Sequence, residues 1–222
     1  MQLADHPAVG VCLDSFHILS RGHDPAGIED IPGEKIFYLQ LADAPALQMD
    51  VLSWSRHHRL FPGEGAFDLT GFVRHVLAAG YDGPLSLEIF NDTFRQTDPQ
   101  RTAVHALRSL LWLQDELHLI DIPDAKPPNG FDFVEIKAED TSEVEVLLTQ
   151  LGFTPRGRHR SKPVSLWCAG RARVVLNEQQ ARDQLPHVAA IGLQVPDAEA
   201  TSGRATALMA PTAYRRTYAA EQ

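Results

Sequence analysis

Cysteine is scarce in this chain of 222 residues, which contains only Cys12 and Cys168. Two cysteines exclude a disulfide framework and a zinc site built from cysteine alone. No apolar run approaches the roughly 20 residues that a membrane-spanning helix needs. Residues 1–10 lack the basic leader and the apolar core of a signal peptide. We therefore expect a soluble, cytoplasmic protein with no membrane partner.

Basic residues are also few, with 20 Lys and Arg against 29 Asp and Glu and a formal net charge of −9. This balance argues against nucleic acid as a partner, because phosphate neutralisation needs clustered basic side chains. The chain is 44% apolar and 22% charged, which is close to the values of ordinary globular proteins. Its length and composition predict one or two packed domains.

A seam divides the chain at residues 121–130, where three prolines and a glycine fall within ten positions. Such a composition is typical of an extended, weakly packed linker. We therefore predict a first domain over residues 1–120 and a second domain over residues 131–222.

The first segment alternates apolar runs with helical patterns. The runs lie at residues 9–13, 36–41 and 85–90. One helix is expected to start at Asp68 and end at Gly80, and another to start at Asp98–Pro99. Alternation of nearly continuous apolar strands with helices predicts a parallel α/β sheet.

The second segment predicts a different, α+β arrangement, with a strand, a helix and then further strands. The expected strands lie at residues 131–137, 164–167, 172–176 and 187–195, and the helix at residues 142–151. Beyond Ala198 the pattern weakens.

Polar side chains lie at or near the ends of the three apolar runs in the first segment: Asp14, Gln40 and Glu88. The carboxyl ends of parallel strands meet at one face of a barrel, where sites form. Two carboxylates and an amide oxygen are hard donors that suit magnesium, manganese or a similar ion. The alternative for each is a hydrogen-bonded polar residue at a strand end.

His17 follows the first run and could act as a general base, or it could be a loop histidine bonded to backbone. Arg59, in the basic stretch Arg56–Arg59, could bind a substrate carboxylate in a bidentate fork, or the stretch could be a solvated loop. Asp43 is better explained by turn chemistry. Glu64, between two glycines, could bind a ligand, or it could equally be a turn carboxylate.

Four motifs together resemble those of the xylose-isomerase-like TIM barrels, and within them the bacterial 3-dehydroshikimate dehydratases fused to a 4-hydroxyphenylpyruvate-dioxygenase-like region. The motifs are Leu13–His17, Leu39–Asp43, Arg59–Gly65 and Leu87–Asn91. The resemblance implies that Asp14, Gln40 and Glu88 are three of four metal ligands for Mg, Mn or Co. It also implies that His17 abstracts a proton and that Arg59 binds the substrate. The implied enzyme is a metal-dependent lyase of aromatic catabolism that converts 3-dehydroshikimate to protocatechuate.

The family's fourth metal ligand is a glutamate on a strand that precedes the one ending at Asp14, and this sequence begins after that strand. A complete (β/α)8 barrel needs roughly 200–250 residues, whereas about 120 precede the linker. We therefore expect the C-terminal half of a TIM barrel, in a fragment of a longer protein that is able to form a homo-oligomer.

The second segment resembles a vicinal-oxygen-chelate (VOC) module, with the order βαβββ and a restart near His187. In active members of that superfamily a histidine at such a strand start binds metal. In the fused family the first module is expected to be metal-free, so His187 is better explained as a structural residue.

Three other functions remain open. One is a sugar phosphate isomerase or epimerase, because the same barrel and metal serve proton transfer between adjacent carbons. Another is a 4-hydroxyphenylpyruvate-dioxygenase-like protein, which ranks low because its two-His-one-carboxylate ligand set is not visible. The last is an inactive fragment that acts at most as an interaction surface.

Overall fold

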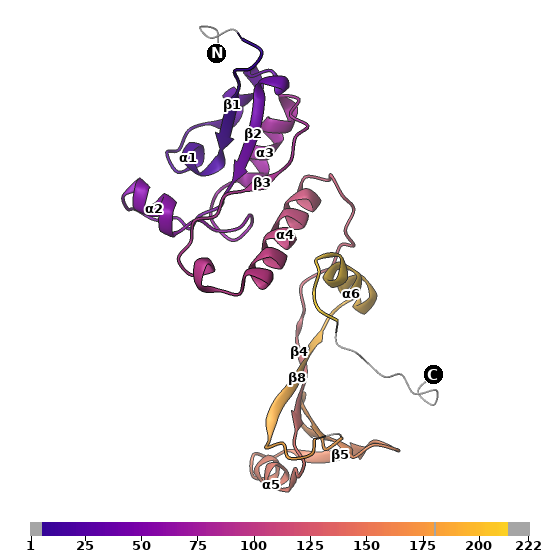
Figure 1. Cartoon of the computed structure of the whole chain (residues 1–222). Helices are drawn as coiled ribbons and strands as arrows, with labels where there is room; N and C mark the ends of the chain where they lie inside the picture. Colours follow the sequence, from indigo (N-terminus) through magenta and orange to yellow (C-terminus); the bar gives the residue numbers. More distant parts are fainter. Residues whose placement is uncertain (1–5, 180, 213–222) are drawn as a thin grey trace. The chain divides into compact units, whose positions relative to one another are not determined.

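The computed structural model describes residues 6–179 and 181–212 (Figure 1), which divide into two compact units. The first unit comprises residues 6–122 together with 205–212, and the second comprises residues 123–204. Within these described ranges, no helix has both the length and the apolar character needed to cross a membrane. Each unit has a core of its own and is described by itself.

The first unit contains a parallel three-stranded sheet in the order β1-β2-β3. Its strands are β1 (Val11–Asp14), β2 (Ile36–Leu41) and β3 (Ser86–Leu87). The register pairs Asp14 with Gln40, and Gln40 with Ser86. The carboxyl ends of the three strands therefore lie side by side, and the three expected polar residues come to the same edge.

Strand β2 matches its expected range, whereas the other two strands differ from expectation. Strand β1 starts two residues later and includes Asp14. Strand β3 ends at Leu87, so the expected strand over residues 85–90 is too long. The chain leaves the ladder there because the Phe90 carbonyl accepts the Arg59 N–H and because His58 bridges Asn91.

The helices of this unit are α1 (Ser15–Leu19), α2 (Val51–His57), α3 (Leu69–Ala78) and α4 (Pro99–Glu116). The expected caps are confirmed, since Asp68 accepts from the Gly71 N–H and Asp98 from the Arg101 N–H. Gly80 has a φ of 89°, which a residue without a Cβ adopts readily after a helix. Short 3₁₀ turns occupy Pro25–Asp30, Gly33–Lys35 and Phe94–Gln96.

The main core of the first unit lies between the sheet and helices α3 and α4. Phe72, Val73 and Val76 of α3 are fully buried with Leu39 of β2 and Leu113 of α4. Burial of each such side chain stabilises the fold by about 1.5–3 kcal/mol. This layer holds the strands in position, so that their carboxyl ends form a rigid base for a site.

The second unit contains a five-stranded mixed sheet in the order β5-β6-β7-β4-β8. Its elements are β4 (Gly130–Lys137), α5 (Ser142–Gln150), β5 (Thr154–Arg158), β6 (Val164–Ala169), β7 (Ala172–Asn177) and β8 (His187–Gln194), and α6 (Ala198–Ala207) follows. Strands β4 and β7 are parallel, and the other pairs are antiparallel. Helix α6 lies where the sequence pattern weakens. The βαβββ order and the following strand match the expected module.

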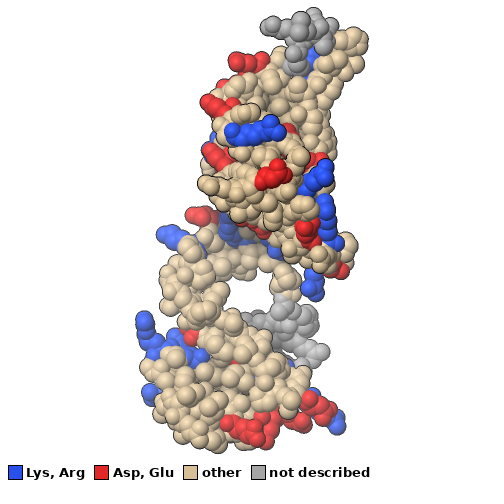
Figure 2. Space-filling view, turned by 90° about the vertical axis from the view of Figure 1, so that its left-hand side faces the viewer, with Lys and Arg blue, Asp and Glu red and all other residues tan. Residues whose placement is uncertain are grey.

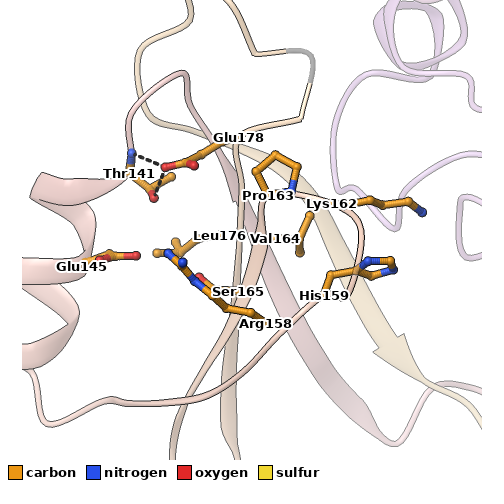
Figure 3. A pocket seen from close by; sticks show the side chains of 10 residues that line it. All are labelled: Thr141, Glu145, Arg158, His159, Lys162, Pro163, Val164, Ser165, Leu176 and Glu178. Carbon is orange, nitrogen blue, oxygen red and sulfur yellow. Dashed lines mark hydrogen bonds between the residues drawn. The ribbon is translucent and has the colours of Figure 1, made fainter.

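Helix α5 packs on one face of this sheet, with Val144 and Leu148 against Trp167 and Leu176. The start of the helix is closed by Glu178, which follows β7 (Figure 3). Its Oε1 accepts from the Thr141 N–H at 3.1 Å and from the Thr141 hydroxyl at 2.7 Å. A carboxylate at a helix N-terminus is favourable, so this contact fixes the helix to the sheet.

Candidate active site

The five residues expected to form the site line one cavity of about 910 Å³ in the first unit. They are Asp14, His17, Gln40, Arg59 and Glu88. The cavity lies at the carboxyl ends of the parallel strands, where sites form in parallel α/β folds. The other lining residues are Cys12, Leu52, Ser55, Arg56, His57, Phe90 and Arg95, and Arg56 and His57 belong to the basic stretch that precedes Arg59.

Arg59 lies at the centre of this arrangement, and its side chain is only 1% exposed. Its Nη1 is 3.1 Å from Asp14 Oδ2 and 3.0 Å from Glu88 Oε2. The guanidinium also donates to the Ser55 carbonyl and hydroxyl, and it lies 4.7 Å from the Phe16 ring centroid. The alternative of a solvated basic loop is therefore wrong for Arg59, because two carboxylates and helix α2 surround its charge.

Asp14 has two separate tasks. Its Oδ1 accepts from the N–H groups of Phe16 and His17, and so caps helix α1. Its Oδ2 faces Arg59. A single carboxylate therefore links the end of β1, the start of α1 and the guanidinium. His17 consequently lies on a short helix, whereas the alternative to its role as a base placed it in a loop.

Gln40 and Cys12 form the next layer of the cavity wall. The Gln40 amide nitrogen donates to Glu88 Oε1 at 2.8 Å, and the Cys12 thiol donates to the Gln40 amide oxygen at 3.3 Å. Burial raises the pKa of the Cys12 thiol, and the charges of Asp14 and Glu88 add to this effect. The thiol is therefore held in its protonated form beside the two carboxylates.

His17 lines the cavity with a ring that is half exposed. Its side chain is 49% exposed, and its Nε2 is 3.6 Å from Asp14 Oδ2 and 3.4 Å from Arg59 Nη2. Half of the ring nevertheless remains open to the cavity and to solvent.

The donor chemistry fits a hard divalent cation. Oxygens of Asp14 and Glu88 converge on one nitrogen of Arg59, so they already meet where positive charge is held. Within residues 6–179 and 181–212, no group of three or more His, Cys, Asp or Glu side chains is arranged to hold a metal. A cation here would thus depend on an amide oxygen such as that of Gln40, and on a shift of the Arg59 contacts.

A histidine–aspartate pair lies at the rim of the cavity. His57 Nδ1 is 2.9 Å from Asp92 Oδ2 and 3.1 Å from Oδ1, and Arg95 lies 3.7 Å from the same carboxylate. The hydrogen bond from His57 lowers the pKa of Asp92, and the charges of His57, Arg95 and His58 lower it further. Nothing in the sequence spacing indicated this pair, because its members are 35 positions apart.

The remaining expected residues lie outside this cavity. The Asp43 side chain is buried and accepts four backbone N–H groups, from Ala44, Gly63, Gly65 and Phe67. Glu64 pairs with His105. In the second unit, His187 is exposed and its Nδ1 contacts the Leu185 carbonyl. Asp43 has a structural role, as expected, but not in a local turn, because it pairs with Leu60 and its carboxylate holds the loop at residues 63–67.

A smaller cavity of about 220 Å³ lies in the second unit beside the start of α5 (Figure 3). Arg158 and Lys162 line it together with Glu145 and Glu178. Charges of both signs thus meet there. On the face of the first unit drawn in Figure 2, acidic and basic side chains are likewise interspersed.

Comparison with protein families identifies the class of this molecule. A family described as "Xylose isomerase-like TIM barrel" matches residues 1–115, which is more than half of the chain. A second family, described as "Hydroxyphenylpyruvate dioxygenase, HPPD, N-terminal", matches residues 126–221. The chain belongs to the xylose isomerase-like TIM barrel family and carries a region of the second kind after it. The predicted fold class, barrel strands followed by a VOC-like module, is confirmed.

Individual relatives narrow this class. The 3-dehydroshikimate dehydratase of Pseudomonas putida is 44% identical to this chain over an alignment of 227 residues. The alignment covers 92% of this chain and 36% of that protein. The enzyme of the same name from Pseudomonas aeruginosa is 49% identical over an alignment of 192 residues, which covers 79% of this chain and 30% of that enzyme. A solved structure of a xylose isomerase-like TIM barrel/4-hydroxyphenylpyruvate dioxygenase fusion protein is 44% identical in sequence and superposes with a TM-score of 0.82. The match covers 93% of this chain and 37% of that protein. The chain therefore spans about a third of these relatives, and the resemblance seen in the sequence is confirmed.

Proposed function

We propose that this chain supplies metal-holding groups and the catalytic base of a 3-dehydroshikimate dehydratase, a lyase that removes water from 3-dehydroshikimate to give protocatechuate. The observation that carries the proposal is the meeting of Asp14, His17, Gln40, Arg59 and Glu88 in one cavity. Two relatives that align with 92% and 79% of this chain bear that enzyme's name. We also propose residues 1–120 and 131–222 as its two functional regions.

Asp14, Gln40 and Glu88 would hold a divalent cation, with Mg, Mn or Co as candidates because the donors are oxygens. Such an ion, when bound, polarises the substrate ketone as a Lewis acid. The amide hydrogen bond from Gln40 to Glu88 and the α1 cap on Asp14 hold these side chains in place. Well-fixed ligands of this kind raise the affinity of a site.

His17 is the proposed base that removes the proton next to the ketone. Its half-exposed ring lines the cavity beside Asp14, whose charge stabilises the imidazolium that forms. Arg59 is the proposed partner of the substrate carboxylate. Its Nη2 lies on the His17 side of the guanidinium, so this nitrogen is the one from which Arg59 would reach the substrate.

A sugar phosphate isomerase or epimerase is the second candidate, because the family match itself is to an isomerase-like barrel. Both activities start with removal of a proton next to a carbonyl, and both use the same cavity. They differ in the product, because only the dehydratase releases water and forms an aromatic ring. The test must therefore compare products and not only binding.

The decisive experiment places the whole chain in a complete barrel. In the P. putida dehydratase, the segment that matches this chain is exchanged for it, and protocatechuate formation is measured by its absorbance with manganese and again after chelation. We expect manganese-dependent turnover. In the same chimera, His17→Asn should reduce turnover about 10²–10⁴-fold while leaving the bound manganese per chain unchanged.

Two results would overturn the proposal. One is a folded, manganese-loaded chimera that makes no protocatechuate while the P. putida parent does. The other is a chimera that interconverts sugar phosphates at a higher rate than it forms protocatechuate, which would favour the isomerase. Unchanged turnover in His17→Asn would remove the base assignment alone.

A further inference from the structure

The dehydration moves two protons, one away from the carbon next to the ketone and one onto the departing oxygen. Removing the proton next to the ketone leaves His17 protonated and puts an electron pair into an enolate. The carbon–oxygen bond on the neighbouring carbon then breaks, and the departing oxygen leaves far more readily as water than as hydroxide. A proton donor in the same cavity would meet this need.

His57 is the second histidine that lines the cavity. It is the last residue of α2. The other end of this helix is capped by Asp50, whose carboxylate accepts from the Ser53 N–H. Asp92 accepts from its Nδ1 through both oxygens, at 2.9 and 3.1 Å. A carboxylate on Nδ1 fixes the ring orientation and directs Nε2 away from Asp92.

We propose that His57, held by Asp92, donates the proton that converts the leaving hydroxyl into water. This inference rests on the proposed dehydratase function. It assigns the role of acid to His57, which is neither a proposed metal ligand nor the proposed base. Asp92 is then a positioning residue, because it acts through the imidazole.

The C–H pair becomes the enolate, and the proton goes to His17. As the enolate collapses, the C–O pair leaves with the oxygen, which takes the Nε2 proton of His57 and departs as water. The resulting ring tautomerises, so that one proton passes from a ring carbon to the ketone oxygen and the aromatic diol forms. His17 loses its proton to solvent, and solvent reprotonates His57, so no further reactant is needed.

The two histidines can be separated because their steps leave different traces. In the chimera described above, His57→Gln should lower protocatechuate formation about 10²–10⁴-fold with little change in KM. In heavy water, the same variant should still exchange the substrate proton next to the ketone for deuterium, as followed by NMR. His17 is half exposed, so its proton exchanges with solvent between reversible abstractions. His17→Asn should lose both exchange and elimination.

His58→Gln is the matched control, since this neighbouring histidine does not line the cavity, and it should keep parental turnover. Asp92→Asn tests the positioning role. It should lower kcat while leaving KM and the deuterium exchange little changed, because the His57 ring loses the carboxylate that orients it. His57 is 45% exposed, so its replacement removes little packing.

The outcomes separate the two proposals. If the parent chimera forms no protocatechuate, the dehydratase function fails and the inference fails with it. If the parent turns over and His57→Gln keeps at least a third of its rate, the acid assignment alone is wrong. Equal loss of deuterium exchange and elimination in His57→Gln would also overturn it, because His57 would then act before the water leaves.

Discussion

At the residue scale, the site is organised by one buried cation between two carboxylates. Arg59 is almost completely buried, whereas Asp14 and Glu88 are 10% and 30% exposed. A buried guanidinium is costly unless its hydrogen bonds are satisfied, and here the carboxylates and Ser55 satisfy them. The arrangement therefore depends on all partners being present together.

Replacing the cation should expose this dependence. In Arg59→Met, Asp14 and Glu88 lose their shared partner, so we expect the free energy of unfolding to fall by about 3 kcal/mol. The measurement is urea denaturation in the presence of a chelator. Arg56→Met, an exposed residue of the same cavity, should change stability by less than about 0.5 kcal/mol. A loss below about 1 kcal/mol for Arg59→Met would show that the contacts contribute little.

The buried Asp43 makes a second prediction at this scale. Its Oδ1 accepts from Ala44 and Phe67, and its Oδ2 from Gly63 and Gly65. Asp43→Asn turns one oxygen into a donor that faces N–H groups. We expect a loss of about 3 kcal/mol in urea denaturation. Asp24→Asn, at an exposed turn with one such bond, is the control, and similar losses in both variants would contradict the argument.

Residue types at strand ends were sufficient to predict which side chains gather, because parallel strands share an edge. The partners of those side chains could not be predicted. The burial of Arg59 and the pairing of His57 with Asp92 both depend on contacts between positions 29 to 45 apart. No local pattern records such contacts, so the sequence left a solvated loop open as an alternative.

At the scale of elements, the strongly patterned helices were predictable and the short ones were not. Helices α3 and α4 combine a capping aspartate with a repeating apolar stripe, which is why their starts were placed correctly. Helices α1 and α2 have five and seven residues, too few for a period to show. Yet these two short helices carry His17 and His57, so the sequence was least informative where the site is built.

The cap of α2 gives a pH prediction. The Ser53 N–H bonds to Asp50 and lowers its pKa. The cap is therefore fully present above the ordinary value near 4, and it is lost as the pH falls through the lowered value. Hydrogen-exchange protection of the Ser53 amide should decrease only in that acidic range. Asp50→Asn should keep protection at low pH, and Asp50→Ala should lack it throughout; protection that falls near neutral pH would contradict this.

At the scale of the whole molecule, composition was the best guide. The proline-rich seam predicts two parts, and each described unit has its own buried cluster, around Phe72 in the first and Trp167 in the second. The sheet order of the second unit could not be read from the sequence. Strand β4 pairs in parallel with β7 and antiparallel with β8, and this choice depends on packing across the whole sheet.

Metal binding is a property of the whole chain that a thermal melt can report. A ligand that binds only the folded state stabilises it by RT ln(1 + [L]/Kd), or about 2.7 kcal/mol at 100 times Kd. We expect manganese to raise the Tm of the chain and a chelator to reverse the rise. The net charge of −9 attracts any cation, so sodium chloride at equal ionic strength is the first control.

Three variants distinguish manganese binding in the cavity from the general attraction of cations to the negatively charged chain. Asp14→Asn should abolish the manganese-dependent rise, because it removes one of the two convergent carboxylates. Glu64→Gln removes a carboxylate of the same unit that pairs with His105 outside the cavity, so it should leave the rise unchanged. Arg59→Met should enlarge it, since the guanidinium competes with the metal for the same oxygens. An equal rise in all three variants would place the metal elsewhere on the acidic surface.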